Sequence, residues 1–256
     1  MAAVMVSAAA LAAGGMLALW GLSVRLRDAS IVDPFWGPGF ALIAWASVLV
    51  AGPSPRGLLL AALVTAWGLR LGLHLAWRSR GHGEDRRYAA MRAGHGERFW
   101  WVSLFTVFLL QAALMWSVSL PLQAGAALGR AAPLGLLEAA GTAVFALGLV
   151  FETLADAQLA RFIADPANRG RVMDQGLWAW TRHPNYFGDF LVWWGLGLIA
   201  LGTGAWWSLA GPLLMSVLLL RVSGVTLLES TITERRPGYA AYAARTSAFF
   251  PRPPGR

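Results

Sequence analysis

Long runs of apolar residues, each close to the length of a membrane-crossing helix, dominate this 256-residue chain. A helix needs about 20 consecutive apolar residues to cross the hydrocarbon core of a bilayer. The expected spans are residues 4–24, 35–51, 57–77, 99–120, 134–154, 187–201 and 206–227, with the fifth continuing as helix to about 162. The sequence therefore predicts an all-α, polytopic transmembrane bundle of about seven helices.

The small number of charged residues supports this membrane assignment. Charged residues make up 13% of the chain and hydrophobic residues 57%, whereas soluble domains carry about a quarter charged residues. The net charge of +8 is typical here of loops that face anionic lipid, and we expect no nucleic acid partner. The chain has no cysteine and its four histidines show no metal-site spacing, so we expect no metal site.

The placement of arginine predicts the orientation of the bundle. With the N-terminus outside and the C-terminus in the cytoplasm, the cytoplasmic segments hold most of the arginines, whereas the outer segments hold only Arg56 and Arg130. This asymmetry follows the positive-inside rule and agrees with an odd number of spans. The first apolar run has no basic segment before it, so we interpret it as a retained helix rather than a signal peptide.

Ionisable residues inside the expected spans are the first candidates for function, because polar groups are costly within a bilayer. The third span carries Arg70 and His74 one helical turn apart, where they would line a polar cavity or bond to neighbouring helices. The fifth span ends with Glu152 and Asp156 in the same relation. Two carboxylates on one face repel unless cations meet them, so this is either a ligand site or a solvated helix end.

The densest polar cluster covers residues 171–189 and leads into the sixth span. It ends in the run Arg182-His183-Pro184-Asn185-Tyr186-Phe187-Gly188-Asp189. Asn185 and Asp189 face the same way on a helix that Pro184 would begin. These polar residues at a helix start suit an anionic ligand, whereas the aromatic residues Trp178, Trp180 and Tyr186 are typical of an interfacial belt.

Further charged candidates lie in the last and second spans. Arg221 lies inside the last apolar run and Glu229 follows two turns later, so the two would contact a ligand or join two helices. Asp33 opens the second span, where the helix dipole favours an acid, so it is either a helix cap or a catalytic group. The chain has no Rossmann or P-loop motif, and any nucleotide must therefore bind between helices.

From about residue 152 to residue 251 the arrangement of these motifs resembles the membrane reductases of the steroid 5α-reductase family, in particular its bacterial branch. The resemblance rests on Asp156 with Arg161, Arg171 with Gln175-Gly176-Leu177, the segment 182–189, Arg221, and the tail from Glu229 through Tyr239 and Tyr242 to Phe249-Phe250-Pro251. The assembly is specific, although its single triplets are not.

The resemblance implies a seven-helix bundle that binds NADPH between its C-terminal helices and cytosolic loops. It also implies hydride transfer to a carbon–carbon double bond conjugated to a carbonyl, while an acid group hydrogen-bonds the carbonyl oxygen. The implied cofactor-binding residues are Glu152, Asp156, Arg161, Arg171, Arg182, His183, Asn185, Tyr186, Asp189, Arg221 and Glu229.

The N-terminal half departs from the pattern of that family, which uses a glutamate in the second-helix region and a tyrosine in the third. Asp33 is expected to take the first role, but Trp67 or a neighbour falls near the second. Arg70, His74 or Tyr88 would then substitute. We place the catalytic residues among Asp33, His74 and Tyr88, and the expected substrate is a steroid-like or other apolar lipid.

The resulting prediction is one integral membrane domain over residues 1–256. Residues 1–132 would shape the lipid substrate cavity and residues 133–256 would bind NADPH. The expected partners are the substrate and membrane lipids, and the expected state is a monomer in the bacterial inner (plasma) membrane.

Two other functions remain open. The isoprenylcysteine and phospholipid methyltransferases, which bind S-adenosylmethionine, share the R-H-P-x-Y-x-G segment and a similar tail, although they tend to have two adjacent glutamates where Glu229 is followed by Ser230. A non-enzymatic lipid-binding or transport protein would place its polar residues along a path through the bilayer midplane. Here the polar residues gather on the expected cytoplasmic side, which favours a cofactor site.

Overall fold

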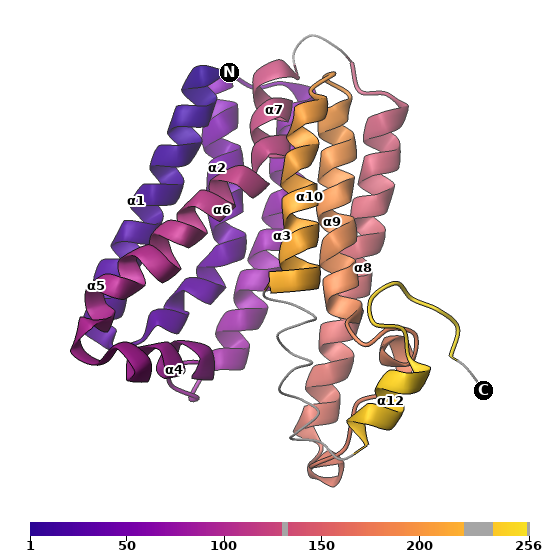
Figure 1. The fold of residues 1–256 in the computed structure, drawn as a ribbon. Helices are drawn as coiled ribbons and strands as arrows, with labels where there is room; N and C mark the ends of the chain where they lie inside the picture. Colours follow the sequence, from indigo (N-terminus) through magenta and orange to yellow (C-terminus); the bar gives the residue numbers. More distant parts are fainter. Residues whose placement is uncertain (130–132, 223–237, 255–256) are drawn as a thin grey trace. The chain divides into compact units, whose positions relative to one another are not determined.

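The computed structural model describes residues 1–129, 133–222 and 238–254 (Figure 1). Within these ranges the regular structure is entirely helical, as predicted. Five helical segments are long and apolar enough to cross a membrane: Ala2–Leu26, Ala29–Ala51, Pro55–Ser79, Arg86–Val118 and Leu136–Ala164. The protein is therefore a polytopic helical membrane protein.

The sixth and seventh expected spans are helical but are not among these five segments. Helix α9 (Pro184–Leu201) has 18 residues, and its first turns carry the polar residues Asn185 and Asp189. Residues 206–222 of the seventh are built from η6 (Trp206–Leu209), α10 (Ala210–Val217) and the π-helical turn η7 (Leu218–Val222). Its remaining expected residues, 223–227, lie outside the described residues.

The chain divides into two compact units, which we describe one at a time. Unit 1 contains residues 1–139 and 198–211, and unit 2 contains residues 140–197 and 212–256. Helix α8 (Leu136–Ala164) begins in unit 1 and continues in unit 2. It ends two residues beyond the expected position 162.

In the first half of unit 1, α2 (Val32–Ala51) packs against both α1 (Ala2–Leu26) and α3 (Pro55–Ser79) (Figure 1). A Cβ atom on Gly37 or Gly68 would overlap the backbone of the other, so α2 and α3 touch along their backbones. Small residues at such a crossing are the usual means of close helix packing in membranes.

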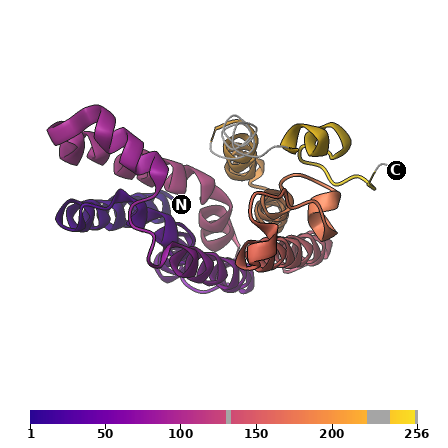
Figure 2. The same ribbon diagram turned by 90° about the horizontal axis from the view of Figure 1, so that it is seen from below.

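The second half of unit 1 contains helices that the sequence did not predict. The expected fourth span corresponds to α5 (Phe99–Ser103), the π-helical turn η3 (Leu104–Leu109) and α6 (Leu110–Val118). It is preceded by α4 (Arg86–His95) and η2 (Gly96–Arg98), and α7 (Leu120–Leu128) follows it. The segment from η3 to α6 packs across α1, as Figures 1 and 2 show from two directions.

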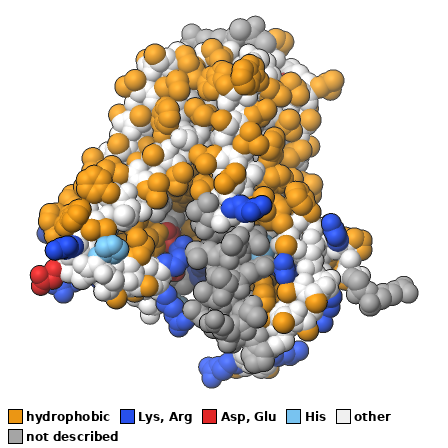
Figure 3. Space-filling view, viewed as in Figure 1, with side chains coloured by type: hydrophobic (Ala, Val, Ile, Leu, Met, Phe, Trp, Pro, Cys, Tyr) orange, Lys and Arg blue, Asp and Glu red, His pale blue; other side chains and the backbone are white. Residues whose placement is uncertain are grey.

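The surface of unit 1 agrees with a position in the membrane. Apolar side chains cover the face formed by α5 and α6, whereas charged side chains gather at the end near α4 (Figure 3). Outward-facing leucines such as Leu49 and Leu73 are more than two-thirds exposed, at 80% and 71%. Such side chains suit contact with lipid tails rather than with water.

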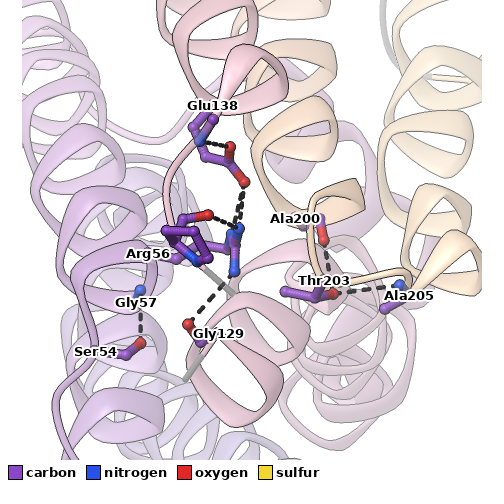
Figure 4. Close-up of polar contacts among 10 residues, drawn as sticks. Ser54, Arg56, Gly57, Gly129, Glu138, Ala200, Thr203 and Ala205 are labelled. Carbon is purple, nitrogen blue, oxygen red and sulfur yellow. Dashed lines mark hydrogen bonds and ion pairs between the residues drawn. The ribbon is translucent and has the colours of Figure 1, made fainter. Parts of the chain in front are cut away.

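At the opposite end of unit 1 from α4, a buried ion pair joins three segments (Figure 4). The Arg56 guanidinium donates to the Glu138 carboxylate from Nε at 2.8 Å and from Nη2 at 2.5 Å. It also donates to the carbonyl oxygens of Gly129 and Pro133, and Glu138 accepts the N–H of Gly135 at 2.6 Å. Arg56 is 1% exposed, so this arginine of the expected outer side has a structural role rather than facing water.

Unit 2 consists of α8, α9 and α10 side by side, with short elements at one end (Figure 1). These are η4 (Pro166–Asn168), η5 (Gly176–Ala179) and α12 (Tyr239–Arg245). A Cβ atom on Gly148 would lie 2.6 Å from the carbonyl oxygen of Gly188, and one on Gly195 would lie 2.6 Å from that of Gly141. These glycines bring α8 and α9 into backbone contact and position the polar residues described below.

Candidate functional site

The first polar cluster lies where α9 begins beside α8 in unit 2. The Asn185 side chain donates from Nδ2 to Oδ1 of Asp156 at 3.1 Å. Asp156 and Glu152, one turn apart on α8, are only 7% and 3% exposed. They are therefore not a solvated helix end, which was one of the two interpretations that the sequence allowed.

Close backbone packing places these carboxylates against α9. A Cβ atom on Gly188 would lie 2.5 Å from the backbone nitrogen of Glu152. The rings of His183 and Tyr186 stack in parallel, with centroids 5.6 Å apart, at the start of α9. His183 is buried, and Asp189, one turn after Asn185, is half-buried. Six of the predicted cofactor residues thus lie on or beside the first turns of α9, namely Glu152, Asp156, His183, Asn185, Tyr186 and Asp189.

The loop before α9 is held against α8 by side-chain hydrogen bonds. Trp178 donates from Nε1 to the carbonyl oxygen of Ala155 at 3.0 Å, and Gln158 accepts the N–H of Leu177 at 3.0 Å. Gly176 reaches this position with a φ of +59°, which glycine adopts without strain. The expected belt residue Trp178 is therefore bonded inside unit 2, whereas Trp180 is 44% exposed.

The C-terminal tail follows the same loop and binds it at several points. The Tyr242 hydroxyl donates to the carbonyl oxygen of Trp178 at 2.6 Å, and Thr181 donates from Oγ1 to the carbonyl oxygen of Phe249 at 2.8 Å. The backbone N–H of Arg182 donates to the carbonyl oxygen of Ser247 at 2.9 Å. Burial raises the pKa of the Tyr242 hydroxyl above its ordinary value, so this donor stays protonated at neutral pH.

The arginines of the predicted cofactor-binding set lie around the cluster rather than in it. Arg161 is exposed near the end of α8, and Arg221 is exposed in η7. Arg171 is also exposed and donates to Oδ1 of Asn168 at 3.3 Å. Arg182 is half-buried and donates to the carbonyl oxygen of Ala243 at 3.4 Å. Glu229, the last member of the predicted set, lies outside the described residues.

The second polar cluster lies in unit 1, where α2 begins beside α4. Asp33 accepts the Tyr88 hydroxyl on Oδ1 at 2.7 Å and Nη2 of Arg87 on Oδ2 at 2.8 Å. Tyr88 is 7% exposed. Gln111 of α6 donates from Nε2 to the Tyr88 hydroxyl at 3.5 Å. The structure thus joins two of the three predicted catalytic residues, Asp33 and Tyr88, directly.

The interpretation of Asp33 as a helix cap is wrong. Helix α2 begins at Val32, before the expected start at position 35, and its N-cap is Ile31, which makes no side-chain cap bond. Asp28 has the capping role one element earlier, where it accepts the N–H of Ser30 at 2.8 Å. The Asp33 carboxylate is therefore available to the side chains of α4.

A second carboxylate, which the sequence did not point to, fixes the position of α4. Glu84 accepts Nε and Nη2 of Arg92, each at 2.8 Å, and the backbone N–H of Ala29 at 2.7 Å. The hydrogen bonds from Arg92 hold the pKa of the Glu84 carboxyl below its ordinary value. Sequence reasoning recognises ion pairs on a helix by a spacing of three or four residues. Glu84 lies before the start of α4 and eight residues from Arg92, so that spacing does not reveal their contact.

The remaining predicted pair, Arg70 and His74, lies on one face of α3. Both side chains are half-buried. The His74 ring lies against Trp77 with the two centroids 6.2 Å apart. Trp67, which falls near the position where the reductase family has a tyrosine, is fully buried at 0% exposure.

The fold defines a multi-pass helical membrane protein, and each unit holds a cluster of hydrogen-bonded polar side chains. The chain belongs to the DUF1295 family, whose members are described as proteins of unknown function, and the match covers residues 19–246. It is 27% identical over 266 residues to an uncharacterized protein of Schizosaccharomyces pombe, a match that spans 91% of this chain and 76% of that protein. No solved structure matches the chain.

Proposed function

We propose that this protein is an NADPH-dependent membrane reductase of a carbon–carbon double bond conjugated to a carbonyl, acting on a steroid-like or other lipid substrate. The observation that carries the proposal is the hydrogen bond between Asn185 and Asp156. These two residues come from separate motifs, and the resemblance to the steroid 5α-reductase family assigns both to the cofactor. We further propose that the protein acts as a monomer in a bacterial inner membrane.

The chemistry of the residues in unit 2 fits a dinucleotide. Buried carboxylates such as Glu152 and Asp156 accept hydrogen bonds from ribose hydroxyls or a carboxamide, and Asn185 offers both a donor and an acceptor. Exposed arginines such as Arg161 and Arg171 bind phosphate oxygens with a forked geometry. Bound there, NADPH would supply the hydride for the reduction.

The residues of unit 1 fit the task of holding a proton near a substrate carbonyl. The Tyr88 hydroxyl is largely shielded from water and donates its one proton to Asp33, so it fixes the position of the Asp33 carboxyl group. A donor at the carbonyl oxygen stabilises the negative charge that develops there during reduction. In its protonated form Asp33 would be that donor, with Tyr88 and Arg87 holding its carboxyl group in place, and His74 on α3 is the alternative acid.

Ligand binding to the full chain in detergent tests the proposal. A ligand at about 100 times its dissociation constant should raise stability by about 2.7 kcal/mol. We expect thermal stabilisation by NADPH and none by S-adenosylmethionine. Stabilisation by S-adenosylmethionine alone would overturn the reductase proposal, and no shift with either would favour a non-enzymatic lipid-binding protein.

One observation favours the methyltransferase as the second candidate. The two segments that this chain shares with those enzymes, around residues 182–188 and in the tail, are physically joined through the bond from Tyr242 to Trp178 and that from Arg182 to Ser247. A joined loop and tail would serve either of these adenosine-containing ligands. The binding experiment above separates the two.

A further inference from the structure

The end of unit 1 near α4 combines tryptophans with arginines at three helix ends. In α1 and α3 the tryptophan comes first and the arginines follow towards the loop, and at the start of α5 the order is reversed. The residues are Trp20 with Arg25 and Arg27, Trp77 with Arg78 and Arg80, and Arg98 with Trp100 and Trp101. This is the layering of a membrane interface, where aromatic rings lie at headgroup level and charges lie further out.

One direct contact brings two of these helix ends together. Trp20 donates from Nε1 to the carbonyl oxygen of Trp100 at 2.7 Å, and the two rings lie with centroids 6.2 Å apart. Arg25 lies five residues beyond Trp20 on α1, about 7.5 Å further along the axis. Arg98 lies two residues before Trp100, at the start of α5 and at the same end of unit 1. The pair of tryptophans therefore has Arg25 and Arg98 beyond it at the same end of unit 1.

The charges at this end are unevenly neutralised. Arg87 pairs with Asp33 and Asp85, and Arg92 pairs with Glu84. Within residues 1–129, 133–222 and 238–254, by contrast, the exposed arginines 25, 27 and 98 make no ion pair.

Two carboxylates are close in sequence to these arginines. Asp28 accepts the N–H and the hydroxyl of Ser30 on Oδ1 and keeps its negative charge. Glu97, next to Arg98, is exposed. Even with both carboxylates ionised, the three arginines leave an excess of positive charge beside the tryptophan pair, and this excess favours an anionic partner.

We propose that Arg25, Arg27 and Arg98 bind the phosphate groups of anionic phospholipids, with Trp20 and Trp100 at the depth of the lipid backbone. Guanidinium groups bind phosphate through paired hydrogen bonds. The depth fits because the tryptophans lie between the apolar surface of α1 and the arginines. The site is in unit 1 and does not depend on the proposed reductase activity.

The test measures phosphatidylglycerol affinity of the full-length protein in detergent, with phosphatidylcholine of the same acyl chains for comparison. A basic residue near a charged surface contributes about 1 kcal/mol, so the double variant Arg25→Gln with Arg98→Gln should bind phosphatidylglycerol roughly twenty- to thirtyfold more weakly. The matched control is Arg169→Gln with Arg252→Gln, which removes the same charge from exposed positions of unit 2 and should leave the affinity unchanged.

A second variant separates loss of charge from loss of fold. Arg25→Lys with Arg98→Lys keeps the charge and should recover most of the affinity, and salt should weaken binding to the unsubstituted protein. Equal affinity for the two lipids, or equal loss in both glutamine variants, would overturn the proposal. Displacement of the lipid by an equal concentration of inorganic phosphate would also overturn it, because the site would then bind any small anion.

Discussion

The side-chain amide of Asn185 donates a hydrogen bond to the Asp156 carboxylate across the contact between α9 and α8. The contact depends on glycine, because a side chain at Gly188 would meet the backbone of Glu152. An amide and two buried carboxylates are thus held on two helices that cannot move apart without losing their backbone packing. A site with this rigidity is suited to select a ligand by its hydroxyl and amide groups.

Replacing Asn185 with alanine should weaken NADPH binding roughly tenfold or more. The loss of a hydrogen bond to a charged or polar ligand group costs about 1.5–3 kcal/mol. Arg171→Ala should have an effect of similar size, because an exposed guanidinium donates forked hydrogen bonds to a phosphate group. Calorimetric titration measures both. The control is Thr153→Ala, an exposed α8 position whose hydroxyl donates to the Leu149 carbonyl oxygen of the same helix. Unchanged NADPH binding in both the Asn185 and the Arg171 variant would refute these assignments.

Replacing Asp33 with asparagine should leave NADPH binding intact and slow turnover. Asparagine keeps an oxygen that accepts the Tyr88 hydroxyl but carries no titratable proton. Proton-transfer catalysis is typically worth about 10²–10⁴-fold, and a loss in this range is expected. Single-turnover reduction of an enone lipid measures it, with the exposed Asp165→Asn as control. Normal turnover would leave His74 or Arg70 as the acid, with Tyr88→Phe as the next variant to measure.

Hydrophobic runs predicted most helices because every membrane-crossing helix must bury its own backbone polar groups and face lipid with apolar side chains. Helix α4 was not predicted, since its ten residues have no apolar face and form a helix held by tertiary contacts. Those contacts run from Glu84 to Arg92 and from Asp33 to Arg87. Local sequence spacing does not reveal such pairings.

The polar cluster of unit 2, like the helices, was predictable only in part. The spacing of Asn185 and Asp189 indicated a shared helix face. Asp156 as the partner of Asn185 followed only from the register in which Gly148 meets Gly188. Register between two helices is set by side-chain shape along the whole contact, which a motif does not encode.

The hydrogen bonds that Glu84 accepts from Arg92 should make the stability of the protein depend on pH. Arg92 lowers the pKa of Glu84 in the folded protein. The stability that this interaction contributes is therefore fully present above the unfolded pKa of about 4.5, and it is lost as pH falls through the lower folded pKa. At pH 7 the unsubstituted protein should exceed Glu84→Gln by about 1 kcal/mol. The difference between their unfolding midpoints should shrink in acid, and a difference independent of pH would contradict this origin.

The orientation of the bundle has a direct test because the chain has no native cysteine. Arg86→Cys places a thiol at the exposed start of α4, on the side that holds most of the arginines. It should resist an impermeant thiol reagent added outside intact cells and react after lysis. Leu136→Cys, at an 89% exposed position at the other end of the spans, should react in intact cells. The reverse pattern would invert the topology.

At the buried pair of Arg56 and Glu138, replacing one partner should lower the stability of the protein more than replacing both. Glu138→Gln leaves the Arg56 charge buried beside backbone carbonyl groups, and such an uncompensated charge typically costs about 3–5 kcal/mol. The double variant Arg56→Met with Glu138→Leu removes both charges and keeps similar volume, so it should be less destabilised than the single variant. The exposed Arg245 and Asp174, which pair at 2.6 Å, provide the control, since Asp174→Asn should cost about 1 kcal/mol or less. Thermal unfolding in detergent measures all four proteins. A double variant that unfolds at a lower temperature than Glu138→Gln would mean that the paired charges, and not only their mutual compensation, hold this end of unit 1 together.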